Sequence, residues 1–363
     1  MKKLLLTLPF TLFIFLGACQ KECNENFEKV KGNIDYAIRY RLDREYNFVE
    51  SQRLNYNENN LVASIDSKVY YRGTHEWDHL GLPDSLIKQY GEQRLGWLPP
   101  IRLVTKKSYN KEGKLIKTQD YYHDNLVKEV TLAYQTGGWI HQTHHEILSD
   151  ERTYSRYTLN SKCQTDRYQT LDSLGNLIRE SNLDQFHLEE LETDGYGNVT
   201  QEVFIEDHEE LGKLIHNRFF VHHIYEDVRR IESVDKLAGK LLSYLKVKDY
   251  QSITDELLGH RFNYLELFDH IGGGKEAYFE SKKVDLLQQY QISRIKEDLS
   301  KRSARGFDWA KASIKEIDKN LRDEDGIKTA RCDFIFTDGQ KEVKLSYLQL
   351  VEFVDGWRLV FVK

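Results

Sequence analysis

Lysine and arginine form no cluster anywhere in this chain of 363 residues, and the formal net charge is −6. A nucleic-acid partner is therefore not expected, because such proteins carry a basic patch or stripe. Beyond its first residues the chain also lacks a long apolar run, and the mean hydropathy is −0.64. A transmembrane helix needs about 20 consecutive apolar residues, so attachment to a membrane would have to be of another kind.

The N-terminus carries the most specific signal in the sequence. Two lysines precede a mostly apolar run, Leu4 to Leu16, which is too short for an ordinary transmembrane helix and fits a secretory signal. The run ends in Leu16-Gly17-Ala18-Cys19, which resembles the lipobox of bacterial lipoproteins. The resemblance implies a signal peptide over 1–18, cleavage before Cys19 and thioether lipidation of that cysteine. The alternative is an ordinary signal peptide with a chance cysteine.

The residue after this cysteine is Gln20, which by the same resemblance favours the outer membrane over retention in the inner membrane. The periplasmic and cell-surface faces both remain open. Loss of residues 1–18 removes two lysines and takes the formal charge from −6 to −8. We therefore expect a membrane partner reached through the lipid anchor, with 19–44 as lipidated N-terminus and linker.

The chain contains only 4 cysteines. If Cys19 carries the lipid, three are left, so at most one disulfide forms and one thiol is unpaired. Cys332 lies in an alternating segment on the same face as Phe334, which predicts a buried core thiol. Cys23 and Cys163 remain for a disulfide, and the sequence does not decide whether they form one.

Tyrosine is abundant, with 22 residues, and it marks a repeated pattern. Stretches with a polar or aromatic entry, an Asn/Asp/Gly turn and a short apolar exit occur at 56–62, 109–116, 122–127, 170–178 and 193–200. Gly113, Gly175 and Gly197 can adopt positive φ without steric cost, so each turn predicts a β-hairpin. Residues 45–230 resemble YD (RHS-type) and MORN-variant repeats, which implies antiparallel hairpins in an extended, twisted sheet.

The repeats are interrupted by a predicted insertion at 72–100. It contains His75-Glu76-Trp77-Asp78-His79, which matches the His-Glu-x-x-His signature of zinc metallopeptidases. Gly81 and Pro83 would end such a helix after two turns, and no third ligand follows at the expected spacing. We favour a polar insertion with an anchoring tryptophan. The alternative is a hydrolase or zinc metallopeptidase that uses His75, Glu76 and His79.

From Val234 onward the spacing becomes helical. Leu237, Leu241 and Leu245 share one helical face, and a long helix is predicted after the glycines at 272–274. These glycines are not a phosphate loop, because no strand precedes them and the lysine that follows is not followed by Ser or Thr. Alternation at 327–337 predicts a strand, and Asp355-Gly356 predicts a tight hairpin.

Helices followed by a curved antiparallel sheet over 234–363 resemble the nuclear-transport-factor-two-like fold. The resemblance implies an α+β cone around an apolar pocket, which some members use for catalysis and many use for binding or assembly. The candidate lining residues are Tyr244, Phe262, Tyr264, Tyr347 and Trp357. The alternative is that these side chains simply fill the core.

These patterns predict a mainly β N-terminal region followed by an α+β cone-like domain. We expect a non-enzymatic envelope lipoprotein that binds a protein or surface ligand. No catalytic residue, metal site or cofactor is nominated. Cys19 is the one residue for which a chemical reaction, lipidation, is predicted. An immunity protein of a toxin system is an alternative, because YD and MORN-variant repeats occur in such systems, but this rests on association by fold.

Overall fold

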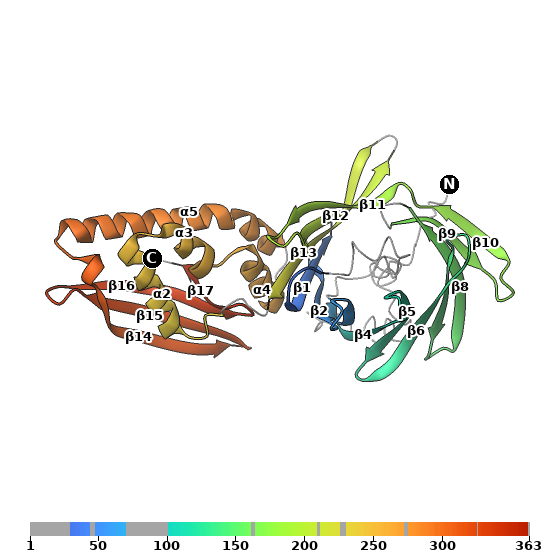
Figure 1. Cartoon of the computed structure of the whole chain (residues 1–363), viewed down its shortest axis with the longest axis horizontal. Coiled ribbons are helices and arrows are strands. Elements are labelled where there is room, and N and C mark those ends of the chain that lie inside the picture. The colour runs from blue at the N-terminus through green and yellow to red at the C-terminus, as the bar shows by residue number, and fades with distance from the viewer. Residues whose placement is uncertain are drawn as a thin grey trace, which may run out of the picture. The chain divides into compact units, whose positions relative to one another are not determined.

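The computed structural model describes residues 30–43, 48–69, 101–160, 164–208, 211–225, 230–271, 275–324 and 326–361. The chain divides into two compact units, Met1–Tyr225 and Glu226–Lys363. The described part of the first unit consists of strands, and the second unit combines helices with a smaller sheet (Figure 1). The predicted fold class, a mainly β region followed by an α+β domain, is confirmed.

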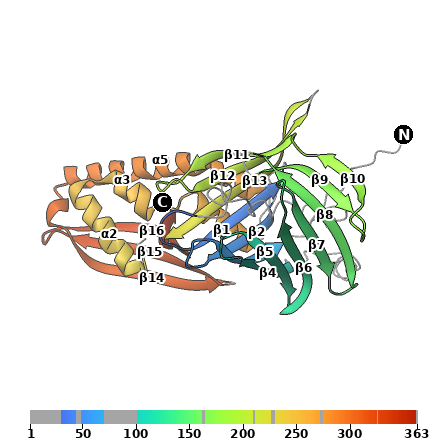
Figure 2. The same ribbon diagram turned by 45° about the vertical axis from the view of Figure 1, so that its right-hand side comes forward.

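One antiparallel sheet of 13 strands forms the described part of the first unit. Its strands are β1 (Ile34–Asp43), β2 (Phe48–Tyr56), β3 (Val62–Val69), β4 (Ile101–Tyr109), β5 (Leu115–Tyr122), β6 (Asn125–Tyr134), β7 (Ile140–Glu146), β8 (Glu151–Leu159), β9 (Thr165–Leu171), β10 (Leu177–Asn182), β11 (Phe186–Thr193), β12 (Val199–His208) and β13 (Gly212–Tyr225). From β1 to β10 each strand pairs with its neighbour in the chain. The sheet curls strongly, as two views show (Figures 1 and 2).

The way in which this sheet curls was not predicted from the sequence. β1 pairs with β13, the last strand of the unit, so the two edges of the sheet are β10 and β11. These edge strands are successive in the chain, and hydrogen bonds link the residue after β10 to β9 and link β11 to the residue before β9. The Leu183 N–H donates to the carbonyl of Asp166 at 2.8 Å, and the Gln164 amide donates to the carbonyl of Leu188 at 2.9 Å.

A five-residue turn recurs at the hairpin ends and accounts for the repeated sequence pattern. In the turn at 110–114, the Asn110 N–H donates to the carbonyl of Lys114. The Asn110 side-chain oxygen accepts from the N–H groups of Glu112 and Lys114 at 3.0 and 2.9 Å. Gly113 has φ +79°, which only glycine adopts without penalty. The same arrangement surrounds Asn57, Asp172 and Asp194.

Tyrosines that precede these turns tie neighbouring hairpins together. The Tyr109 hydroxyl donates to the carbonyl of Val62 at 2.7 Å, and the Tyr134 hydroxyl donates to the carbonyl of Leu115 at 2.9 Å. Val62 begins β3 directly after the turn at 57–61, and Leu115 begins β5 directly after the turn at 110–114. Each tyrosine therefore bonds to the preceding hairpin at the same end of the sheet. The tyrosines of the repeated pattern therefore act as bridges between adjacent repeats.

The turn at 194–198 forms hydrogen bonds with both ends of the described part of the first unit, at Lys31 and Tyr225. The Asn198 side chain accepts from the Lys31 N–H at 2.7 Å and donates to the Lys31 carbonyl at 2.8 Å. It also donates to the Tyr225 hydroxyl at 2.8 Å, and this hydroxyl donates to Asp194. Burial alone would raise the pKa of Asp194, but hydrogen bonds from Tyr225 and the Asn198 backbone lower it below its ordinary value.

The second unit packs helices against a four-stranded antiparallel sheet. Its strands are β14 (Ser313–Glu324), β15 (Ile327–Thr337), β16 (Glu342–Phe353) and β17 (Gly356–Phe361), and its helices are α2 (Val234–Val247), α3 (Tyr250–Ser252), α4 (Arg261–Ile271) and α5 (Lys275–Ala304). A π-helical turn spans Ile253–Leu257, and a 3-10 turn spans Trp309–Lys311. None of the described helices combines the length and apolar character needed to cross a membrane.

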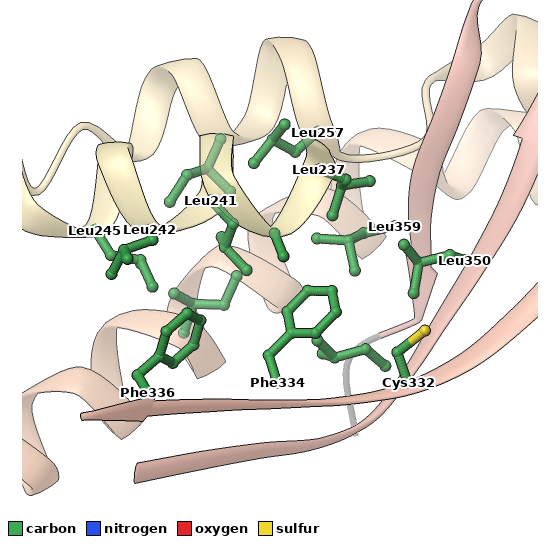
Figure 3. Packing of buried hydrophobic residues seen from close by; sticks show 14 of the residues in the cluster. Leu237, Leu241, Leu242, Leu245, Leu257, Cys332, Phe334, Phe336, Leu350 and Leu359 are labelled. Atoms are coloured by element: carbon green, nitrogen blue, oxygen red, sulfur yellow. The ribbon is translucent and has the colours of Figure 1, made fainter. Parts of the chain in front are cut away.

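Helix α2 shows how the sequence builds the core of the second unit. The Ser233 side chain caps its N-terminus by accepting from the Lys236 N–H at 3.1 Å. Leu237, Leu241 and Leu245 recur at helical spacing and are buried, as predicted. They belong to one cluster with phenylalanines of β15 and leucines of β16 and β17 (Figure 3). Each fully buried leucine contributes roughly 1.5–3 kcal/mol.

Cys332 lies in the same core, which confirms the prediction of a buried thiol. It is 1% exposed and neighbours Phe334 and Leu350 in Figure 3. Burial raises the pKa of Cys332 to about 11, so the group remains an unreactive thiol at neutral pH.

Candidate functional site

The five aromatic residues predicted to line a pocket lie in several places within the second unit. Tyr244 and Trp357 pack in the main core, whereas Tyr264 belongs to a second, smaller apolar cluster. Phe262 lies edge-on to a histidine ring, with the centroids 6.0 Å apart. Tyr347 lies in β16, and its side chain is outside the described part.

A pocket of about 140 Å³ lies in the second unit, between α2, α5 and strands β16 and β17. Its lining residues are Leu241, Leu245, Ile295, Leu299, Leu345, Leu348 and Leu359, together with Arg294, Glu297, Asp298 and Lys301 of α5. The apolar residues belong to, or pack against, the core cluster, part of which Figure 3 shows. Of the four predicted aromatic residues whose side chains are described, none is among those that line it. Periodicity placed the leucines in the core but could not show where packing leaves a space.

Four charged residues of α5, two of each sign, line this pocket. Lys301 Nζ lies 2.5 Å from Glu297 Oε1, and Arg302 lies 3.2 Å from Asp298 Oδ2. Both are pairs one helical turn apart on α5. The hydrogen bond with Lys301 is the main cause that lowers the pKa of Glu297. Arg294 is exposed and makes no ion pair or hydrogen bond with a described residue, and its charge adds to the lowering of the Glu297 pKa.

A second polar cluster surrounds Asp355 at the hairpin between β16 and β17. One carboxylate oxygen accepts from Arg358 at 2.7 Å and lies 2.9 Å from His260 Nε2. The other oxygen accepts from Asn263 at 2.9 Å. Asp355 is 4% exposed and Asn263 is fully buried. These bonds join the start of α4 to a hairpin more than 90 residues later, which explains why sequence spacing predicted the turn but not its partners.

Glu266 lies on α4, and its carboxyl group reaches the same hairpin. One of its oxygens accepts from the Val354 N–H at 2.9 Å. The other is buried and has no hydrogen-bond partner among the described residues. Burial raises the pKa of Glu266 to about 8, and the nearby Asp355 and Asp269 act in the same direction. The carboxyl group is therefore mostly protonated at neutral pH, a state that sequence alone did not indicate.

The inner face of the large sheet carries one buried and one half-buried ion pair. Arg39 of β1 lies 2.7 Å from Glu202 of β12, and Arg41 lies 3.6 Å from Glu50 of β2. Gln52 donates to Glu50 at 3.0 Å. Burial raises the pKa of Glu202, and the attraction of Arg39 offsets part of this rise. Such pairs stay buried only because each charge has a partner.

The same inner face continues with half-buried and buried polar groups on β5 to β7. Asp120 accepts from the Thr105 hydroxyl at 2.6 Å, and burial raises its pKa while Lys128 opposes that rise. Burial and the charge of Lys128 lower the pKa of His144 to about 3, so this ring is neutral at pH 7. Polar residues in an alternating strand usually face solvent, so the burial of these side chains could not be predicted from the sequence. Only the curling of the sheet turns this face inward.

Several predicted sites lie outside the described residues. They are Cys19, Cys23 and Cys163, and His75, Glu76 and His79 of the insertion. Lipidation, the disulfide and the zinc-peptidase alternative therefore stay predictions.

Comparison with known proteins identifies no family for this chain. No family model matches it, and no curated protein matches it. Among solved structures it is similar to a crystal structure of a porin-like protein from Bacteroides uniformis, at 8% identity and a TM-score of 0.25. The match covers 55% of this chain and 100% of that chain. The resemblances to lipoproteins, to YD or MORN-variant repeats and to the nuclear-transport-factor-two-like fold thus rest on sequence patterns.

Proposed function

We propose that this protein is a non-enzymatic, lipid-anchored component of the bacterial outer membrane and that its second unit binds a small amphipathic ligand. The segment Leu16-Gly17-Ala18-Cys19 supports the anchor. The leucine-lined pocket beside Arg294 is the observation that carries the binding role. In this proposal the hairpin unit serves as a platform.

The size and charge of the pocket define the class of ligand. A cavity of roughly 150 Å³ is large enough for benzene, so a pocket of about 140 Å³ suits an apolar group of similar size. The exposed guanidinium of Arg294 favours a negative charge at the other end of the ligand, because Glu297 and Asp298 already have cationic partners. Short aliphatic carboxylates combine both properties.

Hexanoate is the probe for the binding role. We expect the full-length protein in detergent to bind hexanoate by titration calorimetry and Arg294→Gln to weaken this binding about tenfold, the typical effect of losing a charge-assisted hydrogen bond. Leu345→Phe should also weaken it by filling the pocket. Arg305→Gln is the matched control, since Arg305 is another exposed arginine close to the end of α5. No measurable binding, or equal affinity in all variants, would refute the proposed ligand class.

The anchor is tested separately through Cys19→Ala. Each buried CH₂ of an acyl chain contributes about 0.8 kcal/mol of membrane affinity, so several chains make release negligible. The variant should leave the outer-membrane fraction, and mass spectrometry of the wild type should find a lipid on the mature N-terminus. Cys23→Ala is the control and should fractionate like the wild type. An unmodified N-terminus in the wild type would exclude lipid anchoring.

A further inference from the structure

The pocket of the second unit has a polar side and an apolar side. Among the described residues that line it, the charged ones all belong to α5. Arg294, Asp298 and Lys301 follow one another at spacings of four and three residues, which places them along one edge of this helix. The rest of the lining consists of leucines from α2, β16 and β17 and of Ile295 and Leu299 of α5. A linear ligand with one charged end therefore has a defined direction in this pocket.

The apolar side of the pocket ends at side chains that lie deep in the core. Leu241 of α2 is 2% exposed, and Leu359 of β17 is 1% exposed. Both belong to the same cluster as Phe334, which is fully buried, and Figure 3 shows them in the space between α2 and this ring. Protein cores are packed as densely as organic crystals, so a ligand that reaches these leucines finds little room beyond them.

The volume of the pocket limits how long a chain fits in front of these leucines. The pocket holds about 140 Å³, and a cavity of roughly 150 Å³ is large enough for benzene. An aliphatic tail of about five carbons is close to benzene in size, so it fits when its carboxylate lies at the charged edge of α5. The longer tail of octanoate exceeds this space.

We infer that Leu241 and Leu359 set the chain length of the carboxylate that the second unit binds, so that hexanoate fits and octanoate is excluded. This inference rests on the proposed function, because it takes the carboxylate to lie at the charged edge of α5. It also goes beyond that function, since a pocket open at its far end would bind longer chains more tightly, by about fourfold for each added CH₂. The two leucines replace this steady rise by a maximum.

A series of carboxylates tests the length limit in the wild type. Butanoate, hexanoate, octanoate and decanoate are titrated into the full-length protein in detergent, and protein-free micelles provide the blank for partition into the detergent. From butanoate to hexanoate we expect the affinity to rise about 15-fold, which is about fourfold for each CH₂. Octanoate should bind at least about tenfold more weakly than hexanoate, because a misfit of one methylene in an apolar pocket already costs about that much.

Leu241→Ala should lengthen the pocket. It removes most of the side chain and leaves a cavity in front of the core, so octanoate should now bind more tightly than hexanoate. Leu237→Ala is the matched control. Leu237 is fully buried one helical turn earlier in α2 and belongs to the same cluster, but it is not among the described residues that line the pocket. This variant should keep the preference for hexanoate. Leu241→Val loses less volume, so it serves if the alanine variant does not fold, and it should shift the preferred chain to heptanoate.

Two results would overturn this inference and leave the proposed function standing. One is an affinity that keeps rising about fourfold for each CH₂ through octanoate and decanoate. The other is a chain-length preference that Leu241→Ala and Leu237→Ala change alike. If none of the four carboxylates binds to the wild type, the proposed function fails and this inference fails with it. The ratio of two affinities on the same variant is unaffected by a general loss of folded protein, so it reports on the pocket alone.

Discussion

Glu266 is a single side chain that should make the stability of the second unit depend on pH. Its pKa is about 8 in the folded chain, against an ordinary value of 4.5. Between these values the folded chain keeps the proton and the unfolded chain has lost it. The protonated carboxyl group therefore stabilises the fold most below pH 4.5. As pH rises from there to 8, its contribution to the free energy of unfolding falls by about 1.4 kcal/mol for each pH unit.

Glu266→Gln isolates this effect from other titrating groups. Glutamine keeps an oxygen that can accept from the Val354 N–H but cannot ionise. We expect the free energy of unfolding of the variant to rise relative to that of the wild type between pH 5 and pH 8, measured by urea denaturation. Glu316→Gln, at an exposed glutamate of β14, is the control. A difference between variant and wild type that does not change with pH would show that Glu266 is not protonated in the folded chain.

Individual residues differ in how far the sequence could predict them. Cys332 was predicted as a buried thiol because its strand alternates with phenylalanines, which is a local signal. Glu266 gave no such signal, because its burial depends on the backbone of Val354, which lies 88 residues further along the chain. The pocket beside Arg294 was missed for the same reason, since it forms where side chains from four elements fail to fill the space.

At the scale of elements, the recurrent turns should contribute measurably to the stability of the first unit. Gly113 has φ +79°, so Gly113→Ala should lower the free energy of unfolding by about 1 kcal/mol through backbone strain. The equivalent position in the turn at 57–61 is Asn60, with φ 59°. Asn60→Gly should therefore be neutral or stabilising by less than about 1 kcal/mol. Urea denaturation measures both, and equal losses in the two variants would contradict this role of the turn.

The hairpins were predictable because a turn and its two strands are contiguous in sequence. Pairing between β1 and β13 was not, because it joins opposite ends of the first unit and no local pattern specifies it. Strand β14 was also missed. Its sequence is mostly charged, and only Ile314 and Ile317 pack against the core, so it lacks the alternation by which β15 was recognised.

For the whole molecule, the apolar clusters indicate two units that are stabilised by separate cores. The main cluster of the second unit draws its residues from between Ile231 and Leu359. The clusters described in the first unit lie between Ala37 and Val221. Each unit therefore has its own source of hydrophobic stabilisation, and we expect two transitions on thermal unfolding.

Phe334→Ala tests this division. Phe334 is fully buried and packs edge-on to Phe336 with the ring centroids 6.4 Å apart, so its truncation should cost about 3–5 kcal/mol. Scanning calorimetry should show a lower midpoint for the transition of the second unit only. Leu115→Ala, in the core of the first unit, should lower the other transition instead. If either substitution shifted both transitions equally, the two units would unfold as one, and the stability of each would have to depend on more than its own core.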